Sequence, residues 1–268
     1  MSSDESKIDM SKGERIAKRI ARAGICSRRD AERLIAEGKV SLDGKVLTSP
    51  AVLVTELSVI KVAGKLLPTI EATRLWRYHK PKGVVTTHKD PQGRPTLFER
   101  LPPDLPRVIS IGRLDLNSEG LLLLTNDGAL ARRLELPSNG WLRRYRVRVH
   151  GTIDPRALLQ LAKGVTVDGV TYGGVEATLD STKGANSWLT MSLKEGKNRE
   201  IRKLVEHLGA DVNRLIRLSY GPFQLGYLEP GQVEEVPARI LRDQIGAGAG
   251  APPARGKRKP RTAKPDAT

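Results

Sequence analysis

One acidic residue, Asp115, stands in the stretch whose composition best suits chemistry, GRLDLNSEGLLLLTNDG at residues 112–128. It lies between Gly112 and Gly120, and four leucines follow at residues 121–124. The glycines allow a tight turn and the leucines predict a buried strand, so the core would hold the turn while the carboxylate faces a cleft. A carboxylate in that position can act as a nucleophile or a general base. The pattern alone more often indicates a plain polar turn between two core strands.

A second candidate is Tyr145, which lies in a segment of strict alternation at residues 143–150. The alternation predicts one strand with an apolar face that includes Tyr145 and a basic face that includes Arg146. Its pattern leaves open whether Tyr145 is an ordinary core aromatic or a functional residue.

A third candidate is the segment EGKNREIR at residues 195–202, which precedes a helix. Asn198 is a suitable N-cap, and apolar residues recur at positions 201, 204, 205 and 208. Arg199, Arg202 and Lys203 fall in the first turns, where the helix dipole disfavours positive charge. We infer that these cations meet an external anion or an internal carboxylate.

The elements that precede these candidates predict a small basic module at residues 12–67. Two short helices, the second capped by Ser27 with Asp30 three residues later, are followed by a small sheet with a hairpin at Asp43 and Gly44. The density of cations makes an RNA-facing surface the favoured interpretation. The cations concerned are Arg15, Lys18, Arg19, Arg22, Arg28, Arg29 and Arg33.

The composition supports a nucleic-acid partner. The 268 residues carry a formal charge of +16 with a pI near 10.2, which favours a polyanion, and RNA over a membrane surface. No apolar run approaches a membrane span and no signal peptide is evident, so we expect a cytoplasmic protein. The single cysteine, Cys26, excludes an internal disulfide, and four scattered histidines show no metal-ligand spacing.

Four regions follow from the order of these signals. We expect disorder at residues 1–11, the basic module at 12–67, a linker at 68–73, a larger domain over 72–243 and a disordered basic tail at 246–268. Strands outnumber helices in the larger domain without regular alternation, which predicts an α+β fold on a mainly antiparallel sheet. No Gly-rich phosphate loop and no Ser/His/Asp arrangement is evident, so ATP, NAD and S-adenosylmethionine have little support.

Taken together, the three candidate segments and YHKPKG at residues 78–83 resemble the motifs of pseudouridine synthases, in the branch that modifies small- and large-subunit ribosomal RNA. The segments AGICSRRDA at 23–31 and IAEGKVSLDGK at 35–45 look like the small RNA-binding module shared by a ribosomal protein, tyrosyl-tRNA synthetase and several RNA-modifying enzymes. The resemblance covers nearly all of residues 12–243, and the long motif around Asp115 is its most specific part.

The resemblance implies a role for each matching residue. Asp115 would be the essential carboxylate, and Tyr145 would stack on the target uracil and take a proton from its carbon 5. Arg202 would form an ion pair with Asp115, and Arg113 would fill the gap left by the flipped nucleotide. Ile201 and Leu218 would form apolar walls. The target nucleotide must leave its stack, and we expect phosphate contacts from Lys80, Lys82, Arg144 and Arg199 to offset that cost.

Pseudouridine formation needs no redox step or energy input, so no cofactor and no metal are expected. The sequence leaves open whether Asp115 attacks the sugar, attacks the uracil ring or acts as a general base. The form of the basic module and the basic tail favour one uridine in the peptidyl-transferase region of large-subunit rRNA. The sequence carries no signal for the oligomeric state, and a monomer is the default expectation. Small-subunit rRNA, tRNA, or a non-catalytic role in ribosome assembly stay open as alternatives.

Overall fold

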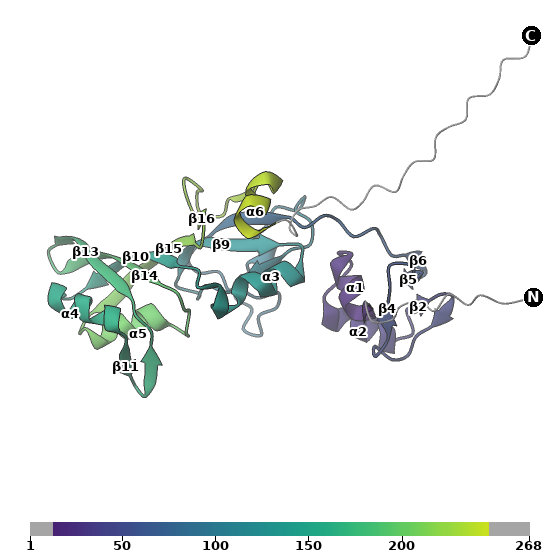
Figure 1. Cartoon of the computed structure of the whole chain (residues 1–268), viewed down its shortest axis with the longest axis horizontal. Helices are drawn as coiled ribbons and strands as arrows, with labels where there is room; N and C mark the ends of the chain where they lie inside the picture. The colour runs from purple at the N-terminus through teal and green to yellow at the C-terminus, as the bar shows by residue number, and fades with distance from the viewer. Residues whose placement is uncertain (1–12, 247–268) are drawn as a thin grey trace, which may run out of the picture. The chain divides into compact units, whose positions relative to one another are not determined.

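The computed structural model describes residues 13–246, which divide into two units between Thr73 and Arg74 (Figure 1). The division falls at the end of the segment that the sequence predicts as a linker. The predicted tails at 1–11 and 246–268 lie outside the described residues, residue 246 excepted. Within the described part of the chain, no helix has the length and apolarity needed to cross a membrane.

The first unit contains the two predicted helices and a small sheet. Ser27 caps the second helix, because its side chain accepts a hydrogen bond of 3.1 Å from the backbone N–H of Asp30. Asp43 and Gly44 adopt positive φ angles of 49° and 84°, which is the geometry of the predicted tight hairpin. Its elements are α1 (Ile16–Arg22), α2 (Arg28–Ala36), β1 (Glu14–Arg15) paired with β4 (Leu53–Val54), and a sheet of β3 (Lys45–Val46), β2 (Val40–Leu42), β5 (Ile60–Val62) and β6 (Lys65–Leu66).

The second unit is built on one large sheet, which confirms the predicted α+β fold. In spatial order its strands are β13 (Glu176–Lys183), β14 (Asn186–Leu193), β10 (Arg143–His150), β15 (Asp211–Tyr220), β9 (Glu119–Thr125), β7 (Leu75–Lys80) and β17 (Val233–Glu235). Two further strands, β8 (Ile109–Ile111) and β16 (Phe223–Gln224), pair with β9 and β15. Every pairing in this sheet is antiparallel except that of β15 with β9.

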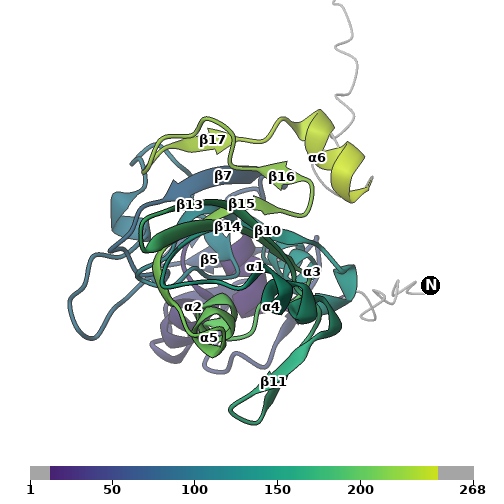
Figure 2. The same cartoon turned by 90° about the vertical axis from the view of Figure 1, so that its left-hand side faces the viewer.

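Helices cover one face of the half-sheet made of β13, β14, β10 and β15 (Figure 2). Val147, Leu189 and Met191 project from this face and pack with Leu204 and Val205 of α5 in one buried core. Besides α5 (Glu200–His207), the unit contains α3 (Gly128–Glu135), α4 (Pro155–Gln160), α6 (Ala238–Ile245), the hairpin of β11 (Val165–Val167) with β12 (Val170–Tyr172), and the 3-10 turns η2 (Phe98–Arg100), η3 (Pro137–Asn139) and η4 (Leu161–Lys163).

The two halves of the large sheet meet where β9 runs parallel to β15. Glu119 lies opposite Ile216, and Gly120 lies opposite Arg217. Gly120 has a φ of +102°, and a Cβ atom placed on it would lie 2.4 Å from the Arg217 carbonyl oxygen. Only glycine therefore allows this approach, which brings the turn carrying Asp115 next to β10 and β15.

Candidate active site

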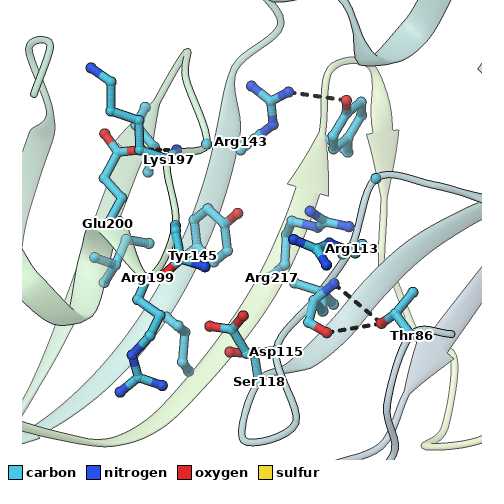
Figure 3. Close-up of a pocket in the computed structure, with 18 of the residues that line it drawn as sticks. Thr86, Arg113, Asp115, Ser118, Arg143, Tyr145, Lys197, Arg199, Glu200 and Arg217 are labelled. Carbon is cyan, nitrogen blue, oxygen red and sulfur yellow. Dashed lines mark hydrogen bonds between the residues drawn. The ribbon is translucent and has the colours of Figure 1, made fainter. Parts of the chain in front are cut away.

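A cleft of about 580 Å³ opens where the turn at residues 112–118 faces β10, β15 and the start of α5 (Figure 3). Its walls come from segments far apart in the chain. The lining residues are Thr86, Ser110, Gly112, Arg113, Leu114, Asp115, Ser118, Glu135, Arg143, Tyr145, Leu193, Gly196, Lys197, Asn198, Arg199, Glu200, Ile201, Leu215, Arg217 and Tyr220.

Backbone hydrogen bonds hold the turn that carries Asp115. The Ser118 N–H donates to the Asp115 carbonyl at 3.0 Å. The Thr86 hydroxyl donates to the Leu114 carbonyl at 2.9 Å, and Glu135 Oε1 accepts from the Gly112 N–H at 2.6 Å. The Asp115 side chain is half-buried, and its carboxylate faces the cleft (Figure 3). The turn is thus fixed at several points while the carboxylate stays accessible.

Lys80 lies beneath this turn and is fully buried. Its Nζ donates to the carbonyls of Pro81, Asp115 and Ser118 at 3.1, 3.1 and 2.9 Å. Burial lowers the pKa of Lys80 to about 8, although the nearby Asp115 and Glu119 act in the opposite direction. The expected phosphate contact of Lys80 is wrong, because the side chain is enclosed and its three donors already bind backbone carbonyls.

The predicted faces of β10 are confirmed. Tyr145 is only 8% exposed and its ring faces the cleft on the same side as Asp115 (Figure 3). Arg144, Arg146 and Arg148 are exposed and project from the opposite face of the sheet. The Tyr145 ring and the Asp115 carboxylate therefore line one cleft, whereas their chemical roles stay predictions.

Arg217, Arg143 and the Tyr220 ring that both contact are cleft-wall residues that the sequence did not predict. Arg217 is 3% exposed, donates from Nε to the Leu121 carbonyl at 2.7 Å, and lies over the Tyr220 ring at 5.1 Å. Arg143 donates to the Tyr220 hydroxyl at 3.1 Å and to the Lys194 carbonyl at 2.6 Å. A signal for Arg143 existed, since it shares the odd-numbered face of Tyr145. Arg217 likewise lies two residues after Leu215 in β15, so both side chains lie on the face of the sheet that lines the cleft.

Leu218 does not line the cleft, so its expected role as an apolar wall is wrong. Tyr145 pairs with Arg217 and Arg144 pairs with Ser219, which leaves Leu218 as the extra residue of a β-bulge. Leu215 takes the expected place in the wall, together with Ile201, which is buried and lines the cleft as predicted.

Arg202 does not form the expected ion pair with Asp115 within residues 13–246. Its guanidinium instead donates to the carbonyls of Asn117 at 2.9 Å and Val212 at 3.2 Å. Burial and the neighbouring Arg199 lower the pKa of Arg202, and the charge of Asp115 raises it. The charge of the Asp115 carboxylate therefore affects Arg202, but Arg202 contacts the turn of Asp115 through the Asn117 carbonyl.

The helix that carries Arg202 begins one residue later than predicted. Arg199 adopts a left-handed conformation with a φ of 52° and provides no side-chain cap, and α5 begins at Glu200. The prediction that Asn198 caps this helix is therefore wrong. Glu200 Oε2 accepts from the Lys197 N–H at 2.8 Å instead. The exposed side chain of Arg199 lines the cleft, as does that of Asn198.

Glu200 is a buried acid in the cleft wall that the sequence did not single out. It is 3% exposed, and Oε1 has no hydrogen-bond partner among the described residues. Burial, reinforced by the neighbouring Glu195, raises the pKa of Glu200 to about 7, against the hydrogen bond from Lys197.

The other predicted RNA contacts are distributed over both units. Arg113 is exposed at the cleft, and Lys82 is exposed outside the cleft lining. In the first unit Glu14 lies within 3.3 Å of three predicted cations. A fourth, Arg33, pairs with Asp30 at 3.1 Å, and the remaining three are exposed. The cations that pair with Glu14 are Lys18, Arg19 and Arg22, and the exposed ones are Arg15, Arg28 and Arg29.

The cleft can accept an anionic ligand. Five of its lining side chains are cationic and three are acidic. The cations are Arg113, Arg143, Lys197, Arg199 and Arg217, and the acids are Asp115, Glu135 and Glu200. An accessible carboxylate beside an aromatic ring, among cations, is suited to hold a planar base and its phosphates during covalent chemistry.

Two family models match the chain. That of RNA pseudouridylate synthases matches residues 74–207, and that of the S4 domain matches residues 14–60. An uncharacterized RNA pseudouridine synthase of Rickettsia felis is 52% identical over 228 residues, which cover 85% of this chain and 99% of that protein. The ribosomal large subunit pseudouridine synthase B of Yersinia pestis is 43% identical over 219 residues, covering 80% of this chain and 69% of that protein.

A solved structure agrees in fold. The crystal structure of a pseudouridylate synthase aligns with a TM-score of 0.62 at 23% identity, covering 86% of this chain and 99% of that one. The segment that matches the pseudouridylate synthase model contains Asp115, Tyr145 and most of the other residues that line the cleft. This chain is a member of the RNA pseudouridylate synthase family, an isomerase with an N-terminal S4 domain.

Proposed function

We propose that this protein converts one uridine to pseudouridine in the peptidyl-transferase region of large-subunit rRNA. The observation that carries the proposal is the carboxylate of Asp115 facing the same cation-lined cleft as the ring of Tyr145. The likeness to the large-subunit enzyme of Yersinia pestis supports the rRNA target. Ribosome precursors would be the substrate, which makes the cytoplasm the expected compartment.

Asp115 is the proposed nucleophile, and it attacks either the sugar or the uracil ring. The N1–C1′ bond of uridine breaks, the base turns while the intermediate stays bound, and a C5–C1′ bond forms. Tyr145 stacks on the base and removes the proton from C5, and N1 gains a proton, so the product is an isomer. The reaction consumes no co-substrate.

Arg113 is proposed to occupy the space that the flipped nucleotide leaves in the RNA stack. Flipping costs a few kcal/mol, which contacts between cations and phosphates offset. Arg199 at the cleft and Lys82 nearby are the proposed phosphate ligands in this unit. Arg202 is proposed to stabilise the charge of Asp115 and to position its turn through the Asn117 carbonyl.

The S4 domain is proposed to bind the rRNA outside the target nucleotide. Its exposed cations are the candidate phosphate contacts, and the cations around Glu14 retain a net positive charge of two after pairing with one acid. The residues proposed for this role are Arg15, Lys18, Arg19, Arg22, Arg28 and Arg29.

Carbodiimide mapping of pseudouridine in rRNA from cells lacking the gene tests the target. We expect one site in the peptidyl-transferase region to disappear and to return with the wild-type gene. The Asp115→Asn variant should not restore it, although its affinity for the rRNA should stay within about threefold. If the site that disappears lies in small-subunit rRNA or in tRNA, the proposed large-subunit target is wrong. Full activity of Asp115→Asn would show that Asp115 is not the nucleophile.

A further inference from the structure

We propose that the exposed face of β10 is a second RNA-binding surface, which holds phosphates of the substrate RNA outside the cleft. The surface, called the β10 basic face below, consists of Arg144, Arg146 and Arg148. The inference rests on the proposed function, because its partner is the same substrate RNA.

The β10 basic face points away from the cleft. Its three arginines are exposed, whereas Tyr145 and Val147 between them are buried on the other face. The helices α4 and α5 lie on the buried side of this half-sheet (Figure 2). Alternate residues of a strand are about 7 Å apart, so the three guanidinium groups form a row along the strand. RNA bound in the cleft does not reach this row from inside the sheet.

The row makes no ion pair in the described part of the chain, although an acid, Asp180, lies on the same face and accepts hydrogen bonds from the Thr178 and Thr190 hydroxyls at 3.3 and 2.8 Å. Arg144 lies between Ser192 and Ser219, and Arg146 lies between Thr190 and Ile216. No ion pair involves any of the three arginines within residues 13–246.

The third arginine, Arg148, has no acidic cross-strand neighbour either. Arg148 lies between Trp188 and another arginine, Arg214. Glu119 is fully engaged by Arg214, with contacts of 2.7 and 3.0 Å. Like charges placed side by side on a sheet destabilise it, and opposite charges across strands stabilise it. A polyanion on this face would offset the repulsion.

An aromatic residue within the row favours RNA as the polyanion. The guanidinium carbon of Arg146 lies 4.8 Å from the ring centroid of the half-buried Trp188. Arginine planes and aromatic rings are the surfaces on which unstacked bases pack, and arginines are frequent phosphate ligands. The combination of three unpaired arginines and one tryptophan fits a single-stranded or looped RNA segment.

A triple variant with Arg144→Gln, Arg146→Gln and Arg148→Gln tests the surface. Its affinity for a long rRNA fragment would be measured by filter binding over a series of KCl concentrations. Each lost phosphate contact reduces the slope of log K against log salt by about 0.7–0.9. We expect the slope to fall by about 2 and the Kd at low salt to rise at least about tenfold.

A charge-matched control removes three exposed cations elsewhere in the same unit, with Arg132→Gln, Arg156→Gln and Lys163→Gln. We expect the control to keep the wild-type slope within about 0.5 unit and its Kd within about threefold. Equal losses in both triple variants would mean that only net charge matters, and an unaltered slope in the β10 variant would equally overturn the proposal.

Two further measurements separate folding and catalysis from binding. Replacing the same three arginines with lysine keeps the charges, so the salt slope should return if phosphate contacts are responsible. Pseudouridine formation in a short stem-loop that carries only the target uridine reports on the cleft. We expect kcat/KM of the glutamine variant to fall at least about tenfold on the long fragment and less than about twofold on the stem-loop. Wild-type inactivity on both RNAs would refute the proposed target but leave the binding comparison valid.

Discussion

Replacing Gly120 with alanine tests whether the close approach of β9 and β15 builds the cleft. The added Cβ would lie 2.4 Å from the Arg217 carbonyl oxygen and 2.7 Å from its nitrogen. Both atoms belong to the backbone and cannot rotate away, so the strands must separate by several tenths of an ångström or more. That movement would shift the turn carrying Asp115 relative to Tyr145.

The expected cost has two parts. Alanine at a φ of +102° is strained by about 1–3 kcal/mol, and forcing an extra methyl group into a packed contact costs a further ~1–3 kcal/mol. We therefore expect Gly120→Ala to lower the free energy of unfolding of the second unit by about 2–6 kcal/mol. This is a large share of the ~5–15 kcal/mol that typically stabilises a domain.

Gly112→Ala is the matched control, since Gly112 has a φ of +69° and a Cβ there would meet no atom within 4 Å. Its cost should be the backbone strain alone, about 1–2 kcal/mol. Urea unfolding followed by tryptophan fluorescence reports on the second unit only, because Trp76, Trp141 and Trp188 all lie in it. Equal destabilisation by the two substitutions would refute the steric account.

The remaining predictions concern the turn, the cleft wall and the buried acid. Lys80→Met removes the Nζ donor from three carbonyls, of which only that of Asp115 keeps a second donor among the described residues, the Ser118 N–H. Pseudouridine formation should therefore fall at least about 100-fold while RNA affinity stays within about twofold, and reduced affinity with a normal kcat would instead show that Lys80 contacts phosphate. Leu215→Ala should raise KM or lower kcat about tenfold, whereas Leu218→Ala should change both less than about twofold, and the reverse order would contradict the bulge. The pKa of Glu200 is raised from 4.5 to about 7, so the folded state binds the extra proton between these pH values and loses stability as pH rises through them, by about 2–3 kcal/mol. Glu200→Gln should remove this dependence in urea titrations at pH 5 and pH 8, and an unchanged difference between the two pH values would show that Glu200 ionises normally.

The parts of the fold and of the site that could be predicted are those that local sequence patterns specify. The caps and turns at Ser27 and Asp43 depend on side chains a few residues apart, and alternation placed Tyr145 inside and its arginine neighbours outside. The turn around Asp115 was predicted because glycines and leucines bracket it in the chain. Each of these features is specified within about ten residues.

The features that were predicted wrongly depend on contacts between distant segments. Lys80 is buried because β7 pairs with β9 and sets Lys80 opposite Gly120, directly under the turn. Leu218 lies outside the cleft because a β-bulge shifts the register of β15 against β10 by one residue. The backbone of Arg199 adopts a left-handed conformation that its own sequence does not favour. No pattern along one segment contains this information.

The distribution of hydrogen bonds around Asp115 explains how the fold can orient the proposed nucleophile while its carboxylate stays free of partners from the described part of the protein. The carbonyl of Asp115 accepts from Lys80 Nζ and from the Ser118 N–H, whereas its carboxylate oxygens have no hydrogen bond or ion pair within residues 13–246. Hydrogen bonds to a carboxylate would consume the lone pairs needed for attack and would have to break before reaction. The fold instead fixes the main chain of the turn through a buried lysine and lets Arg202 act on the carbonyl of Asn117. Position is therefore set by the backbone, and the oxygens remain available to the substrate.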